Sequence, residues 1–126
     1  MPATRQTRQQ AAVREAFLAS GRPLSPQEVR RDAGRRAAGI GLATVYRHVR
    51  ALIAEGWLVP VELPGQPARY ERSGQRHHHH FHCRACGRLF DIPGCPGRIS
   101  TSAPRGFTVE DHEITLYGRC PECAPA

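Results

Sequence analysis

Two pairs of cysteines constrain most strongly what this chain can fold into. The pairs are Cys83-x-x-Cys86 and Cys120-x-x-Cys123, and 33 residues separate them. Each pair has the spacing of a tight turn that presents two thiolates, and four thiolates match the tetrahedral coordination of zinc. Redox-active pairs are the alternative, but a reducing compartment favours zinc over disulfides. We therefore predict a structural zinc site at all four cysteines, whose metal contributes free energy of folding to a unit with little core.

The chain has 126 residues, which is enough for one domain or two very small ones. No apolar run approaches the roughly 18 residues of a membrane span, and the polar N-terminus does not resemble a signal peptide. We therefore expect a cytoplasmic protein rather than a membrane protein or a secreted disulfide scaffold. Residues 1–76 hold 13 Arg against 6 acidic residues, whereas residues 77–126 are neutral overall and hold all the cysteines. This division predicts one part that meets a polyanion and another that holds metal.

The basic part has the pattern of three helices followed by a hairpin. A capping box with Thr7 as N-cap begins the first helix, which Gly21 ends. A second capping box at residues 25–28 begins a helix that ends at Gly34, and a third helix runs from Gly41 to Gly56. Residues 57–63 and 68–71 are predicted strands. This order is typical of a winged helix-turn-helix domain.

The third predicted helix has one apolar and one polar face. Val45, Val49, Leu52 and Ile53 recur at helical spacing and are predicted to face the core. The other face is predicted to bind DNA in the major groove, because Arg bonds guanine and Tyr contacts thymine methyls or phosphates. Its residues are Thr44, Tyr46, Arg47 and Arg50. A merely solvated helix face is the alternative, and the one-sided charge favours nucleic acid.

A run of histidines at residues 77–80, followed by His82, leads directly into the first cysteine pair. Side chains alternate on a strand, so His78, His80 and His82 share one face, and His77 and His79 share the other. Each face then offers a pair of imidazoles suited to a transition metal.

Both histidine pairs need further ligands. Glu71 precedes the run and Glu62 lies in the predicted wing, so both are candidates for the first pair. His112 and Cys95 are candidates for the second pair, with Asp91 as a weaker one. A free thiol without metal is the alternative for Cys95.

These motifs together resemble the ferric-uptake-regulator family, most closely its zinc-uptake regulators. The resemblance is carried by residues 40–47, by Arg69-Tyr70-Glu71, by the histidine run, by both cysteine pairs and by Leu116-Tyr117-Gly118. It implies an α+β fold, with a winged-helix domain over residues 1–72 and a small α/β dimerisation domain with a four-cysteine zinc over residues 73–126. It also implies a metal-dependent repressor, without enzymatic activity, that binds operator DNA as a homodimer when its regulatory site is loaded.

The resemblance further implies a regulatory metal site in the hinge and a second metal site in the dimerisation domain. A hinge site would use Glu71, His78 and His80, but the family's usual fourth ligand is missing because residues 22–24 read Arg-Pro-Leu. Glu62, His82 or water could complete this site, and we favour Glu62. The second site would be His77, His79 and His112.

One segment departs from the family. Residues 92–105 contain three prolines and two glycines, which cannot support the family's long dimerisation helix and its Glu ligand. Cys95 falls near that position, and a sulfur ligand favours zinc over Fe(II) or Mn(II). We therefore predict a zinc-responsive repressor. The alternatives are iron, manganese or peroxide sensing by the same fold, or a zinc metalloenzyme or metal carrier, which would leave the basic helix unexplained.

Overall fold

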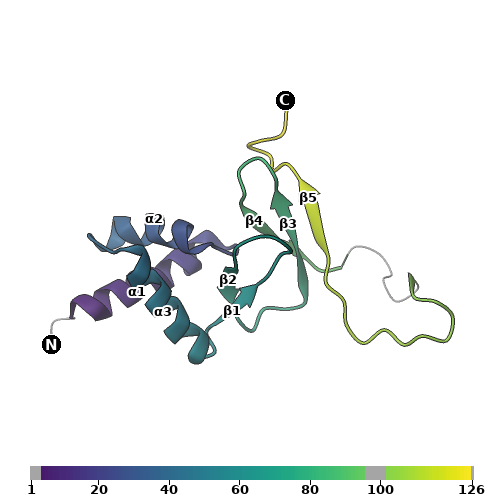
Figure 1. Ribbon diagram of the computed structural model, residues 1–126, viewed down its shortest axis with the longest axis horizontal. Helices are drawn as coiled ribbons and strands as arrows, with labels where there is room; N and C mark the ends of the chain where they lie inside the picture. Colours follow the sequence, from purple (N-terminus) through teal and green to yellow (C-terminus); the bar gives the residue numbers. More distant parts are fainter. Residues whose placement is uncertain (1–3, 96–101, 126) are drawn as a thin grey trace. The chain divides into compact units, whose positions relative to one another are not determined.

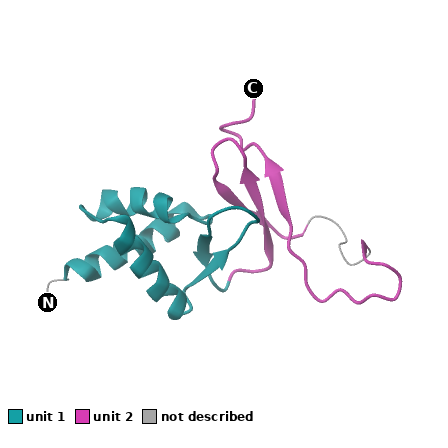
Figure 2. Ribbon diagram, in the orientation of Figure 1, with its two compact units in different colours: residues 1–74 teal, residues 75–126 magenta. Residues whose placement is uncertain are grey.

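Three helices and a two-stranded sheet precede a three-stranded sheet in the order of the chain (Figure 1). The computed structural model describes residues 4–95 and 102–125. The chain divides into two units, Met1–Gly74 and Gln75–Ala126, so the division falls two residues beyond the predicted boundary (Figure 2). The predicted α+β class is confirmed. No described helix is long and apolar enough to cross a membrane.

The first unit has the predicted winged-helix order. Its helices are α1 (Arg5–Ser20), α2 (Pro26–Arg36) and α3 (Leu42–Ala54). Strands β1 (Leu58–Val61) and β2 (Arg69–Arg72) pair antiparallel and form the hairpin. Leu24 and Tyr70 exchange two backbone hydrogen bonds of 2.9 Å, which tie the segment before α2 to the hairpin. The hairpin is thereby fixed to the helices by the backbone as well as by side chains.

The helix ends show which capping predictions are correct. The prediction that Thr7 caps α1 is wrong, because the Thr4 side chain accepts a hydrogen bond from the Thr7 amide at 3.0 Å and the helix begins one turn earlier. The second capping box is confirmed, with Ser25 and Glu28 bonded reciprocally at 3.0 and 3.2 Å. The prediction that Gly34 ends α2 is also wrong. The helix continues to Arg36, where Arg36 pairs with Asp32 at 3.0 Å one turn back.

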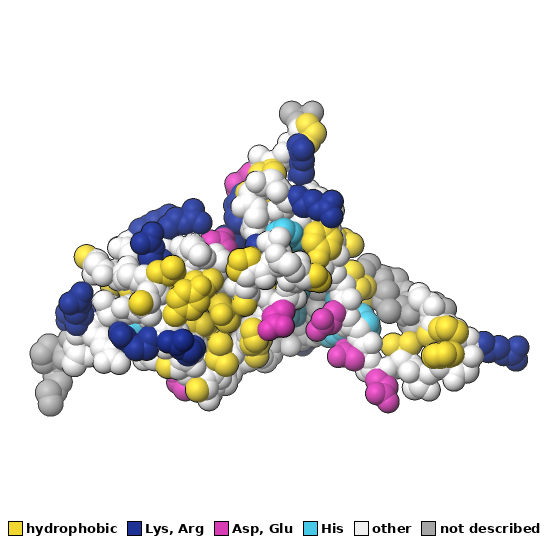
Figure 3. Space-filling model, in the orientation of Figure 1, with side chains coloured by type: hydrophobic (Ala, Val, Ile, Leu, Met, Phe, Trp, Pro, Cys, Tyr) yellow, Lys and Arg dark blue, Asp and Glu magenta, His cyan; other side chains and the backbone are white. Residues whose placement is uncertain are grey.

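The core of the first unit lies among the three helices and β1. Val45, Val49 and Leu52 of α3 are fully buried, as predicted, and Ile53 is half-buried against them. Phe17 of α1 meets Trp57 edge-on, with 6.3 Å between the ring centroids. The polar face of α3 is left outside this core, and arginines are visible on the surface of the helical unit in Figure 3.

The second unit is a sheet in the order β4-β3-β5. Central strand β3 (His78–Cys83) pairs antiparallel with β4 (Leu89–Pro93) and parallel with β5 (Thr115–Gly118). A Cβ atom at Gly118 would lie 3.1 Å from the ring of Phe81, so a glycine lets that ring lie against β5. The described residues of this unit form no α-helix, in keeping with the proline-rich segment, although residues 96–101 of that segment lie outside the described residues.

Leu52→Ala tests whether α3 is held by its apolar face. Leu52 is fully buried, so its truncation should lower the free energy of unfolding of the first unit by about 2–5 kcal/mol. Leu18→Ala on α1 is the control, because Leu18 is 49% exposed and its truncation should have little effect. Equal losses in urea unfolding of both variants would contradict this account of the core.

Candidate metal centres

The four cysteines of the two pairs converge at one end of the three-stranded sheet. Cys83 ends β3, Cys86 lies in the turn to β4, and Cys120 and Cys123 follow β5. Their sulfur atoms all lie within 4.8 Å of one another, and Cys86 and Cys120 are 3.9 Å apart. A tetrahedron with Zn–S bonds of 2.3 Å has edges of about 3.8 Å. The cluster therefore has the dimensions of a closed four-thiolate zinc site.

Backbone amides favour the thiolate form at the centre of this cluster. The amides of Cys120 and Cys86 donate to the Cys83 sulfur at 3.3 and 3.5 Å and lower the pKa of Cys83 to about 6. The turn that supplies the Cys86 amide is closed by a hydrogen bond from the Gly87 amide to the Cys83 carbonyl. Gly87 has a φ of 78°, a conformation that favours glycine.

The sequence prediction did not include one charged neighbour of this cluster. Arg88 donates from Nε to the Cys86 sulfur at 3.1 Å and from Nη2 to Glu122 at 2.7 Å. A cation at this distance offsets part of the negative charge that four thiolates bring together. The sequence gives little indication of this role for Arg88, which is only an arginine two residues after a cysteine.

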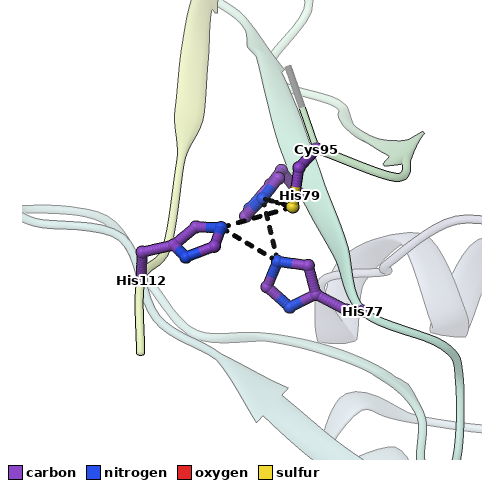
Figure 4. Close-up of side chains that lie close together, drawn as sticks. All are labelled: His77, His79, Cys95 and His112. Carbon is purple, nitrogen blue, oxygen red and sulfur yellow. Dashed lines mark hydrogen bonds between the residues drawn. The ribbon is translucent and has the colours of Figure 1, made fainter. Parts of the chain in front are cut away.

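A second cluster joins His77, His79, Cys95 and His112, whose side chains point toward one another in Figure 4. The Nε2 atom of His77 lies 3.1 Å from that of His79 and 3.0 Å from that of His112. The Cys95 sulfur lies 3.3 Å from the Nε2 atoms of both His79 and His112. These separations are close to the edges of a tetrahedral site with three nitrogens and one sulfur.

Local structure prepares His79 for this cluster. His79 lies in the centre of the sheet with 2% of its surface exposed, and burial, with the neighbouring imidazoles, lowers its pKa. The Ile114 amide donates to its Nδ1 at 3.2 Å and holds the ring with Nε2 toward the other three side chains. A histidine must be neutral to coordinate metal, and burial favours the neutral ring. Because Nδ1 accepts a hydrogen bond, the proton of the neutral ring lies on Nε2, and a metal bound at Nε2 would displace it.

A third cluster lies on the opposite face of β3. His78 and His80 each place Nε2 3.5 Å from the same oxygen of Asp91, which lies on β4. The Arg76 carbonyl accepts a hydrogen bond from Nδ1 of His78 at 2.8 Å, which leaves Nε2 of that ring to face Asp91. Two imidazoles and a carboxylate at this spacing suit a divalent transition metal.

The sequence analysis assigned Asp91 to the wrong pair of histidines. It considered Asp91 for the site of His77 and His79, but β4 pairs with β3 so that Asp91 lies directly opposite His80. Counting outward from the tight turn at residues 83–87 gives this register, so the signal was present in the sequence. His82 is not in the third cluster: its buried ring meets Tyr117 edge-on at 5.7 Å between centroids.

The candidate ligands of the first unit lie on or next to its hairpin. Glu71 is a buried residue of β2, opposite Val59 of β1. Glu62 follows β1 and is exposed. Their roles as metal ligands remain predictions.

The predicted DNA-binding residues lie together on α3. Tyr46, Arg47 and Arg50 are exposed and Thr44 is half-buried, whereas Val45, His48 and Val49 between them are buried. The helix therefore presents these four side chains as one surface. Their contact with DNA stays a prediction.

A comparison with known protein families finds a match that spans both units. The model of the Ferric uptake regulator family matches residues 2–117. The chain belongs to this family. It is therefore a metal-responsive transcriptional regulator, a class to which both the α3 surface and the ligand clusters are suited.

Individual relatives of the chain differ in the metal that they are named for. The chain is 33% identical to the transcriptional regulator FurA of Mycobacterium tuberculosis over 124 residues, which cover 95% of this chain and 83% of FurA. It is 30% identical to the zinc uptake regulation protein of the same organism, with 94% of each chain covered. The solved structure of a zinc-bound manganese uptake regulator has a TM-score of 0.78 and 25% identity, and covers 95% of this chain and 91% of that one.

Cys120→Ser tests whether the four-cysteine cluster holds the second unit together. Cys120 is buried and its amide also bonds Cys83, so we expect the variant to lose metal and to unfold or aggregate in this unit. Cys95→Ser is the matched control, since Cys95 is exposed and lies outside this cluster. Circular dichroism with metal analysis makes the comparison. A folded Cys120→Ser protein with unchanged zinc content would refute the structural role.

Proposed function

We propose that this protein is a zinc-responsive transcriptional repressor that binds operator DNA as a homodimer when its regulatory site is loaded. The observation that carries the proposal is the arrangement of ligands on β3, which presents one histidine pair on each face and ends in the four-cysteine cluster. A closed thiolate site suits a permanent structural metal, and sites with imidazole and carboxylate ligands suit an exchangeable one. We infer that the four-cysteine site holds structural zinc and that the histidine sites respond to metal.

The regulatory hinge site, in this proposal, is built from both units. His78, His80 and Asp91 come from the second unit, and Glu71 joins them from β2 of the first, with Glu62 as a weaker candidate. Only five residues separate β2 from β3, and Glu71 is a buried carboxylate of β2. Ligands shared between two units restrict their relative orientations. The two α3 helices of a dimer can then match the spacing of two operator half-sites.

Cys95 supports zinc as the metal of the second site. A thiolate beside three imidazoles forms a softer ligand set than nitrogen and oxygen alone, and such a set favours zinc over Fe(II) and Mn(II). The relative named as a zinc uptake regulation protein agrees with this assignment, although FurA is slightly more similar, at 33% identity against 30%.

Asp91 favours a second candidate for the hinge site. Two imidazoles with carboxylate ligands accept Fe(II) or Mn(II) as well as zinc, so iron, manganese or peroxide sensing through an iron-bound form is the alternative. Metal analysis of protein titrated with each ion, with operator binding as the readout, separates these cases. A metalloenzyme or metal carrier is disfavoured because neither uses the DNA-binding face of α3.

The homodimer in this proposal forms through the second unit. β5 is an edge strand, and its Leu116 and Tyr117 are 46% and 43% exposed. An edge strand with exposed apolar side chains is suited to pairing with a second chain. We propose that the protein acts in the cytoplasm, where its operator lies.

Arg47→Ala tests sequence readout by α3. Losing one bidentate base contact costs about 1–3 kcal/mol, so the variant should lose far more affinity for a selected operator duplex than for a random one. Fluorescence anisotropy at fixed salt measures both affinities. Arg30→Ala on α2 is the charge-matched control, and equal loss on both duplexes for Arg47→Ala would make Arg47 a phosphate contact.

His80→Ala tests the hinge site. We expect the variant to keep its fold and its four-cysteine zinc, yet to lose metal-dependent operator binding, because the third cluster loses one of its two imidazoles. His79→Ala, which removes a ligand on the opposite face of the same strand, should have the smaller effect. Metal content by mass spectrometry and operator affinity are measured together. If His80→Ala still binds the operator tightly after exchangeable metal is removed, control lies instead at His77, His79, Cys95 and His112.

A further inference from the structure

A polar pocket lies within the first unit, between the start of α1 and the exposed side of α3. Its volume is about 190 Å³. Since a water molecule occupies roughly 30 Å³ of liquid, the pocket has room for a small polyatomic ion. Its lining residues are Thr4, Gln6, Thr7, Gln10, Arg47, His48 and Ala51.

The chemistry of this lining favours an anion. Arg47 carries a full positive charge, and none of the residues that line the pocket is acidic. The N-terminus of the 16-residue helix α1 adds partial positive charge, because the first backbone N–H groups of a helix have no partner within it. Gln6 and Gln10 add amide donors one turn apart.

His48 is the feature of the pocket that a merely structural account does not explain. It lines the pocket and is 3% exposed, yet among the described residues its Nε2 atom is buried without a hydrogen-bond partner. Leaving a buried polar atom unsatisfied costs free energy unless a ligand supplies the partner. Burial and the neighbouring Arg47 also lower the pKa of His48. An anion in the pocket would raise this pKa again and would give Nε2 a partner.

We propose that this pocket binds a phosphate group, supplied by the sugar-phosphate backbone of the duplex that α3 reads. Phosphate oxygens are strong acceptors that match amide and imidazole donors and a helix N-terminus. The donors of Arg47 are assigned to a base, but its charge still attracts an anion at longer range. Phosphate contacts fix the register of a protein on DNA, whereas base contacts select the sequence. His48 and Gln6 therefore set the position of α3 on the duplex. The choice of duplex as the source rests on the proposed function, whereas the choice of phosphate rests on the pocket.

Gln6→Glu tests the pocket without disturbing the core, because Gln6 is exposed. A carboxylate there repels phosphate, although a negative charge in the first turn favours the helix. Affinity is measured against salt concentration, with the zinc-loaded protein and two probes: a duplex selected by this protein from a random library, and a shuffled duplex. Loss of one phosphate contact should reduce the slope of log K against log salt by about 0.9 on both probes.

Gln27→Glu is a closely matched control. Gln27 is the second residue of α2, as Gln6 is of α1, and it is also exposed and does not line the pocket. The substitution changes net charge identically and also lies in the first turn of a helix, so the comparison isolates the position of the new charge. We expect the slope for Gln27→Glu to match that of the parent protein. Equal slopes for both variants would overturn the assignment to the duplex backbone.

Titration with inorganic phosphate provides a second test, which does not depend on DNA binding. At constant ionic strength in chloride, phosphate should shift the His48 ring signals in NMR saturably in the parent protein and not in Gln6→Glu. A saturable shift together with an unchanged duplex slope would assign the pocket to a free phosphate compound and overturn the duplex source. No shift and no slope change would overturn the phosphate site itself. If the parent bound no duplex yet responded to phosphate, the proposed function would fail and the pocket would stand.

Discussion

The position of β3 between β4 and β5 determines where the ligand clusters of the second unit lie. Alternation along this one strand sends His77 and His79 to one face and His78 and His80 to the other. Its last residue, Cys83, enters the four-cysteine cluster, where two backbone amides bond its sulfur. All three ligand clusters therefore take residues from β3 or from the residue just before it. Asp91 of β4 and residues in the segments next to β4 and β5 complete these clusters.

This arrangement places the histidine clusters close to the four-cysteine cluster along the chain. Each histidine site shares its strand with the four-cysteine cluster, so a ligand atom in one site is separated from the next by only a few bonds of backbone. The first unit contributes a different element, helix α3, whose apolar face packs into the core and whose polar face does not. In the proposed mechanism, DNA recognition belongs to the first unit and most of the metal ligands to the second, and Glu71 is the residue that couples them. Coupling of this kind is reciprocal, so operator DNA should tighten metal binding by the factor by which metal tightens DNA binding.

Much of this architecture could be predicted from the sequence because it depends on spacing. The cysteine pairs, the second capping box and the apolar face of α3 are local patterns, and each is found as expected. Errors arose where two residues competed for one role, as Thr4 and Thr7 did for the α1 cap. Asp91 was assigned to the wrong face because the register of a hairpin was not counted from its turn. The pocket beside His48 depends on how two helices pack, which no spacing within one helix reveals.

The repeated histidines have a consequence for how the register of β3 is specified. If β3 slid by one residue, residues 77–80 would still offer one pair of imidazoles to each face, so these four positions alone do not distinguish the native pairing from a shifted one. What distinguishes them is the end of the strand, where Phe81 lies against Gly118 and Cys83 must meet three other thiols. The residues that fix the register are therefore Phe81 and Cys83, at the C-terminal end of the strand, rather than the histidines that the register aligns.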